Sequence, residues 1–237
     1  EKYLRLGGFL GHRPQFQDRE QEFSAISVYW RSGGVRVAST VMNDASADRL
    51  AEVVSYVFHP LLVVIPTLVI AMTSLGSTLG QAIFWTVLSI AIVNLPMAIL
   101  LFWGVRSGKY SDASVSVREQ RTSIYAIGGV CLVILLAVLI LSKAPVVIIA
   151  CLISAVIATA IGYWVNRYTK LSLHSAAMAG CTAVLLWTAP LIGVIVAIFA
   201  PLVGWARIRL KHHTPVQILI GWMVSMICVF VVFQLML

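Results

Sequence analysis

The sequence predicts an all-α integral membrane protein, a bundle of about seven transmembrane helices with its charged loops on one face. Hydrophobic residues make up 60% of the chain and charged residues 11%, whereas a soluble domain carries roughly 25% charged residues. The mean hydropathy is +0.94. A chain this apolar can place its surface only in lipid, and its apolar runs have the length that crosses a bilayer.

Seven apolar runs follow residue 53, each close to the roughly 20 residues that a spanning helix needs. They lie near 54–74, 81–105, 123–141, 145–165, 172–188, 191–206 and 216–236. Gly, Pro and Ser mark the breaks between them, as expected of turns. Three of the breaks are longer and charged, and these cover 106–122, 166–171 and 207–215.

The distribution of cations supports this count and predicts an orientation. With seven spans, the N-terminal tail and the three charged loops share one side, and Lys143 is the only one of the 17 Lys and Arg residues on the other. The positive-inside rule then places the N-terminus and the charged loops in the cytoplasm. The formal net charge of +8 is interpreted as an orientation signal and as attraction to anionic lipid or phosphate, not to nucleic acid.

The first 41 residues differ in composition from the rest and are expected to be a polar N-terminal extension, with a membrane domain over 42–237. Periodicity is poor before Asp44, where a capped helix start leads toward the first span. The extension is either a loose segment outside the natural start, since Met42 stands beside this boundary, or an ordinary cytoplasmic tail. Four cysteines lie singly in apolar runs, so we expect buried thiols without a disulfide or a metal.

Candidate chemistry gathers in the three charged loops, each at the mouth of an apolar helix. The last loop holds Arg207 and His213, with Gln217 one helical turn further on. The guanidinium group of arginine offers planar, paired donors that match phosphate oxygens. His213 and His174 both stand near expected helix N-termini, which favour anions. Two histidines can divide phosphoryl transfer, one attacking phosphorus and the other protonating the leaving alkoxide.

The order of these residues resembles that of the type 2 phosphatidic acid phosphatases, relatives of the vanadium haloperoxidases, over about residues 50–237. The family's last motif is Ser-Arg, five residues, His, three residues, Asp, and here it is Ala206-Arg207, five residues, His213, three residues, Gln217. The family's Pro-Ser-Gly-His is Leu171-Ser172-Leu173-His174 here. Its first motif, Lys, six residues, Arg-Pro, has only Arg118-Glu-Gln-Arg121 in the corresponding place.

The resemblance implies a role for each residue. His213 would be the nucleophile that forms a phosphohistidine, His174 the general acid, and Arg207 a phosphate ligand. Arg118, Arg121 and Lys170 would complete the anion clamp. The implied substrate is a lipid phosphate or a polyprenyl (di)phosphate, with no metal and no cofactor.

Gln217 departs from the family pattern, because it stands where the family has the aspartate that orients the nucleophilic histidine. An amide oxygen can accept the imidazole N–H but cannot stabilise the imidazolium charge, and a comparable change in a serine-protease triad costs about 10⁴ in rate. We therefore expect Gln217→Asp to raise the activity.

Other interpretations of the same residues remain open. Arg207 and the neighbouring cations could be topology anchors, and His213 could be solvated at the membrane interface. Thr214-Pro-Val-Gln217 fits a capping box. Ser172, Ala176 and Gly180 form a stripe of small residues suited to close helix packing.

Two other functions remain as alternatives: a catalytically degenerate protein that binds anionic lipid, and a small transporter. A transporter should show broken helices or paired charges at the midplane, whereas the apolar runs hold almost no ionisable residues. A prenyltransferase needs acidic clusters for Mg²⁺, and past residue 52 the chain has only Asp112 and Glu119. The sequence leaves the lipid and the oligomeric state open.

Overall fold

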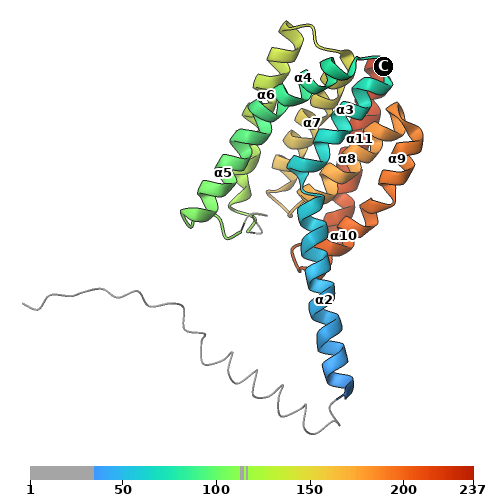
Figure 1. Ribbon diagram of the computed structural model, residues 1–237. Coiled ribbons are helices and arrows are strands. Elements are labelled where there is room, and N and C mark those ends of the chain that lie inside the picture. The colour runs from blue at the N-terminus through green and yellow to red at the C-terminus, as the bar shows by residue number, and fades with distance from the viewer. Residues whose placement is uncertain (1–34, 113–114, 116) are drawn as a thin grey trace, which may run out of the picture. The chain divides into compact units, whose positions relative to one another are not determined.

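A computed structural model describes residues 35–112, 115 and 117–237, and the side chains from residue 45 onward. Every element in this part of the chain is a helix (Figure 1). The elements are α2 (Val35–Val57), α3 (Pro60–Ser74), α4 (Leu79–Ser89), the π-helix η1 (Ile90–Asn94), α5 (Leu95–Arg106), α6 (Arg121–Leu141), α7 (Val146–Val165), α8 (Leu173–Thr188), α9 (Pro190–Ala197), α10 (Phe199–Arg209) and α11 (Pro215–Met236).

Five stretches of the described chain are long and apolar enough to cross a membrane: 79–106, α6, α7, 190–209 and α11. A sixth crossing results if the end of α2 and α3, which meet at an angle of 49°, form one bent span. α8 has 16 residues, about 24 Å of helix against a hydrocarbon core of about 30 Å. The prediction of an all-helical protein with several membrane-spanning helices is therefore confirmed, and length and apolar composition identify five or six of the seven predicted spans.

The chain divides into two units, residues 1–47 and residues 48–237. The expected helix start at Asp44 is wrong, because α2 already begins at Val35. Gly33 and Gly34 are the last helix-breaking residues before α2, and no Gly or Pro lies between them and Asp44. Residues 1–34 of the expected N-terminal extension lie outside the described residues.

Two of the predicted spans contain breaks that the hydropathy pattern does not reveal. The first bends at His59–Pro60, where Pro60 starts α3 and His59 caps it. The second contains η1 directly before Leu95 and Pro96, because a proline lacks the N–H of a regular helical turn. His59 lies at the first of these breaks and Asn94 at the second.

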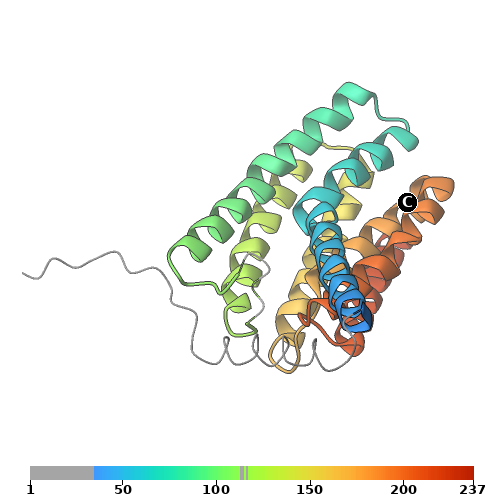
Figure 2. The ribbon, with the colours of Figure 1, turned by 60° about the horizontal axis from the view of Figure 1, so that its bottom comes forward.

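α8 packs against α3, α9, α10 and α11. The predicted stripe of small residues faces α11: a Cβ atom added at Gly221 would lie 3.0 Å from the Ser172 carbonyl oxygen and 3.4 Å from the Ala176 nitrogen. At Gly180, an added Cβ would meet Ser225 at 3.6 Å. This close approach fixes the N-terminus of α8 beside that of α11. Figure 2 looks toward the end of unit 48–237 where α5 is followed by α6, α7 by α8, and α10 by α11.

Candidate functional site

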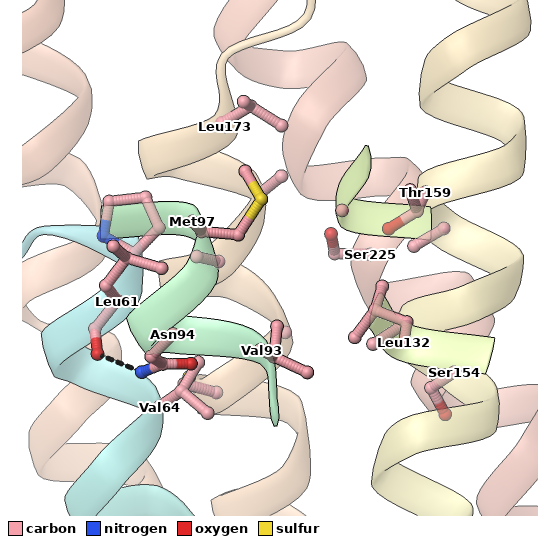
Figure 3. A pocket seen from close by; sticks show the side chains of 18 of the residues that line it. Leu61, Val64, Val93, Asn94, Met97, Leu132, Ser154, Thr159, Leu173 and Ser225 are labelled. Atoms are coloured by element: carbon pink, nitrogen blue, oxygen red, sulfur yellow. Dashed lines mark hydrogen bonds between the residues drawn. The ribbon is translucent and has the colours of Figure 1, made fainter. Parts of the chain in front are cut away.

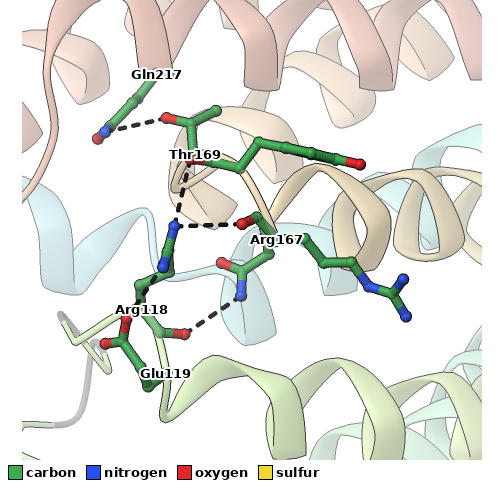
Figure 4. Close-up of polar contacts among 7 residues, drawn as sticks. Arg118, Glu119, Arg167, Thr169 and Gln217 are labelled. Atoms are coloured by element: carbon green, nitrogen blue, oxygen red, sulfur yellow. Dashed lines mark hydrogen bonds and ion pairs between the residues drawn. The ribbon is translucent and has the colours of Figure 1, made fainter.

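Hydrogen bonds join the segments that precede α6, α8 and α11. The Ser172 N–H donates to the Gln217 carbonyl (3.4 Å), and Gln217 Nε2 donates to Thr169 Oγ1 (3.5 Å; Figure 4). Arg121 Nη1 donates to the Leu171 carbonyl (2.7 Å). Residues far apart in the sequence therefore meet at one site.

The turn after α10 explains why a spacing of five residues brings Arg207 and His213 together. The Lys211 N–H donates to the Ile208 carbonyl (2.9 Å) and the His212 N–H to the Arg207 carbonyl (3.1 Å), and Lys211 has φ +56°. This is a Schellman motif, in which a left-handed residue reverses the chain after a helix. The His213 N–H also donates to the Arg207 carbonyl (3.2 Å), so the backbone itself holds the two residues next to each other.

The capping box of α11 fixes the tautomer of His213. Gln217 Oε1 accepts the backbone N–H of Thr214 (3.3 Å) and lies 3.0 Å from His213 Nδ1. A backbone N–H can only donate, so the atom of Gln217 that faces both groups is the amide oxygen, and Nδ1 must carry the imidazole proton. His213 Nε2 then has a free lone pair. The Gln217 side chain thus makes both predicted contacts at once: it completes the capping box of α11 and it orients the ring of His213.

Arg121 donates hydrogen bonds to that lone pair and to two backbone carbonyls. Its side chain is 1% exposed. Nε donates to the Val115 carbonyl and Nη1 to the Leu171 carbonyl, both at 2.7 Å, while Nη2 lies 3.3 Å from His213 Nε2. All three partners are neutral, so the guanidinium charge is buried without a hydrogen-bonded anion. Arg121 therefore positions His213 and also keeps a positive charge beside its Nε2.

Val115 is strained at this contact. It is buried and has φ +46°, a left-handed conformation that is a genuine outlier for a β-branched residue. Such strain persists where the surroundings over-determine the backbone, and it clusters at binding sites. The hydrogen bond from Arg121 to its carbonyl is one interaction that holds it.

Arg207 differs from Arg121 in having donors without partners. It is also 1% exposed, and its Nε and Nη2 atoms are buried with no hydrogen-bond partner among the residues that the structure describes. An unmade hydrogen bond at a buried donor costs about 1–3 kcal/mol, and more when the group is charged. A buried guanidinium with open donors is the feature expected of an anion site that is completed by its ligand.

His174 lies in the first turn of α8, which Ser172 caps as predicted by accepting the Ser175 N–H (3.4 Å). It is 6% exposed, and the charges of Arg207 and Arg121 act on it. Its ring meets that of His59 edge to face, with centroids 5.1 Å apart and an interplanar angle of 85°. The two histidines proposed to share the chemistry are thus buried in one electrostatic environment.

His59 is a residue that the sequence analysis did not assign to the site. Its Nδ1 accepts the Leu61 N–H (3.3 Å) and caps α3. This hydrogen bond requires the proton on Nε2, so the ring presents a donor on its other side. The signal in the sequence was a histidine directly before a proline in an apolar run, which by itself predicts a helix cap and not a site.

The pKa of His213 is lowered to about 3, first by burial and then by the charge of Arg121, while the hydrogen bond with Gln217 acts in the opposite direction. The charges of Arg207 and Lys170 lower it further. His213 is therefore neutral over the whole range in which proteins are normally assayed. A neutral imidazole with a free lone pair on Nε2 is the form that can attack an electrophile.

Arg118 and Lys170 are less closely involved than Arg121. Arg118 is 41% exposed, pairs with Glu119 (3.3 Å), and donates to the carbonyls of Arg167 and Tyr168 at 3.3 Å (Figure 4). These hydrogen bonds connect Arg118, at the protein surface, to the segment before α8. Lys170 is half-buried and contributes its charge.

Comparison of the chain with protein-family models, with curated proteins and with solved structures gives no match. Among the residues that the structure describes, no three His, Cys, Asp or Glu side chains are grouped so as to hold a metal ion. All four cysteines are free thiols.

Proposed function

We propose that the protein is a membrane-embedded phosphatase of the type 2 phosphatidic acid phosphatase kind, acting on a lipid phosphate or polyprenyl (di)phosphate through a phosphohistidine. The observation that carries the proposal is the pair of unpartnered donors on buried Arg207, close to a histidine whose Nε2 is unprotonated and is held by Arg121. A phosphate group supplies the acceptor oxygens and the negative charge that such a site lacks.

In the proposed reaction, Nε2 of His213 attacks phosphorus and the bond from phosphorus to the lipid oxygen breaks. The negative charge of the bound phosphate favours the protonated form of His174, which gives its proton to the leaving alkoxide. Water then attacks the phosphohistidine and gives a proton to His174. This step releases inorganic phosphate and restores both histidines. Arg207 binds the phosphate oxygens. The Nη2–H group of Arg121 changes its hydrogen-bond partner from His213 Nε2 to a phosphate oxygen, which frees the nucleophile.

Gln217 sets a limit on this chemistry. It holds the Nδ1 proton of His213 in place (3.0 Å), which meets the requirement for orientation. It supplies no negative charge for the imidazolium that develops as phosphorus is attacked. The substrate phosphate itself must balance that charge, so we expect slow turnover.

The proposed topology has seven crossings: the bent pair of α2 and α3, the stretch 79–106, α6, α7, α8, the stretch 190–209 and α11. The short α8 begins at the site, so that the catalytic residues would lie recessed below the lipid headgroups. The cation distribution favours a cytoplasmic site. Labels at Ser107 and Ser142 should then report opposite sides, and labelling of both from one side would refute this topology.

A second candidate is a protein that binds anionic lipid without turnover, and Gln217 is the residue that favours it. Both candidates need Arg207, and only the enzyme needs His213 as a nucleophile.

The test is phosphate release from a panel of lipid phosphates, measured for wild type, His213→Asn and His212→Asn in one detergent. His212 is the matched control, because it neighbours His213 and lacks the contact with Gln217. We expect release by the wild type and the His212 variant, and none by the His213 variant. Release that survives loss of His213 would overturn the mechanism, and binding without release would favour the second candidate.

A further inference from the structure

A large cavity extends from the candidate site into the bundle. Its volume is about 380 Å³, within the range of roughly 300–1,000 Å³ that small-molecule sites occupy. His59, Arg121 and His174 line one end, and Leu139, Ile148 and Val229 line it far from the site. The cavity thus runs from these three residues to the apolar middle of the helices, and His213 adjoins it through Arg121, whose Nη2 lies 3.3 Å from His213 Nε2.

The wall of the cavity is apolar and is built from several helices. Figure 3 shows Leu61 and Val64 of α3 facing Leu132 of α6 across the space, with Met97 of α5 beside them. The break at η1 contributes Asn94, whose Nδ2 donates to the Leu61 carbonyl (2.7 Å), so this polar group is already satisfied (Figure 3).

Small side chains keep the space open on the other side. Gly128 of α6, Ala155 and Ala158 of α7, and Ala176, Ala177 and Gly180 of α8 all line it. At Gly128, an added Cβ would find its nearest neighbour at 3.6 Å, the sulfur of Met97. Larger residues at these positions would fill the cavity.

We propose that this cavity binds the hydrocarbon chain of a single-chain lipid phosphate, with the phosphate at Arg207 and His213. The assignment deepens the proposed function, on which it rests for the identity of the headgroup. The charges fit this direction, because the guanidinium group of Arg121 stands at one end of a mostly apolar space. Some hydroxyl groups of the lining donate to carbonyls of their own helices, namely those of Thr67, Ser89 and Ser154. The atoms that line an apolar cavity lack dispersion contacts, and a hydrocarbon chain in the cavity would supply them.

The size of the cavity favours one chain over two. A volume of about 380 Å³ lies near the lower end of the range of roughly 300–1,000 Å³ for small-molecule sites. Its lining runs from the first residue of α6 to Leu139 near its end, and the 21 residues of this helix span about 31 Å. A long space of this modest volume suits one isoprenoid or alkyl chain better than a pair of long acyl chains.

Photo-crosslinking tests this without relying on turnover. The probe is a long-chain alkyl phosphate, long enough to follow α6 from Arg121 to Leu139, with a diazirine at the end of the chain. α6 separates the outcomes, because Leu132, Leu135 and Leu139 line the cavity while Val130 and Val133 are 60% and 55% exposed. We expect labelling of the three leucines by the phosphate probe, and of the two valines by the same chain on an uncharged glucoside.

Two further experiments test how many chains the cavity takes and whether the probe lies in it. A single-chain phosphate should compete with the probe, and a diacyl phosphate at equal concentration should compete weakly. Ala155→Phe should abolish labelling of the leucines, whereas Ile157→Phe should not, because Ile157 lies on the same helix and is 40% exposed, outside the cavity lining.

The outcomes separate this inference from the proposed function. Labelling of the leucines without phosphate release from any substrate would support the chain site and contradict the phosphatase. Phosphate release accompanied by labelling of Val130 and Val133 alone, or equal competition by the diacyl phosphate, would overturn the chain site and leave the phosphatase standing.

Discussion

Arg121 and Arg207 are equally buried, yet the structure predicts opposite effects when each is replaced by methionine. Arg121→Met removes the donors to the carbonyls of Val115 and Leu171. Two buried carbonyls would be left without partners, at about 1–3 kcal/mol each, so the variant should lose roughly 2–6 kcal/mol of unfolding free energy.

Arg207→Met leaves none of the side chain's partners unsatisfied, because its Nε and Nη2 have none among the described residues. The substitution also removes a buried charge, which is often neutral or stabilising when an apolar side chain takes its place. We therefore expect the unfolding free energy of this variant, in the absence of anions, to equal or exceed that of the wild type.

With inorganic phosphate added, the wild type should have a higher unfolding free energy than Arg207→Met. A ligand at 100 times its Kd stabilises the native state by about 2.7 kcal/mol, and this gain should be present in the wild type and absent in Arg207→Met. Denaturant unfolding in detergent, with and without phosphate, measures both quantities. An Arg207→Met protein that is destabilised as much as Arg121→Met, or that keeps the stabilisation by phosphate, would refute the assignment of Arg207 as the open anion ligand.

Four further predictions concern the histidines and their supports. The pKa of His213, about 3 in the folded protein against about 6.5 unfolded, means that the unfolded chain binds the extra proton between these values. Stability should fall as the pH drops through that window, by up to about 1.4 kcal/mol per pH unit, and a titration of His213→Gln that shows the same slope would contradict this. Gln217→Glu keeps the reach and the capping box and adds a charge that raises the pKa of His213, so kcat should rise; an unchanged pH profile would show that the contact is only a cap. His59→Asn retains a good helix cap and removes the ring against His174, so kcat should fall at constant stability, and a loss of stability without a change in kcat would make His59 purely structural. Lys211→Gly and Lys143→Gly both relieve a left-handed residue after a helix. The relief of about 1–2 kcal/mol exceeds the entropy cost of glycine, about 0.5–1 kcal/mol, so both variants should gain stability in unfolding experiments; loss of activity is expected in neither, and a loss in Lys211→Gly alone would show that this turn needs its side chain.

The sequence predicted the helices and one end of the site well, because both depend on local patterns. Apolar runs set the helix bounds, and the capping box that begins at Thr214 predicted the contact between Gln217 and His213. The Schellman turn after α10 likewise explains, from local backbone geometry, why Arg207 and His213 meet.

Other features depend on contacts between distant segments and could not be predicted. Arg118 and Arg121 were equivalent in the sequence, and only the positions of Leu171 and His213 in space decide that Arg121 is the buried one. His59 joins the site because α3 packs against α8. The cavity arises from small residues on helices whose packing no single-chain pattern specifies.

The central claim is that phosphate is transferred to Nε2 of His213. The most direct measurement is to stop turnover of a single-chain lipid phosphate in alkali, which preserves phosphohistidine, and to locate the modified residue by mass spectrometry. We predict a phosphate group on His213 in the wild type and on no residue in His213→Asn. Release of inorganic phosphate by the wild type with His213 unmodified at every time point, together with release by His213→Asn, would contradict the proposed mechanism.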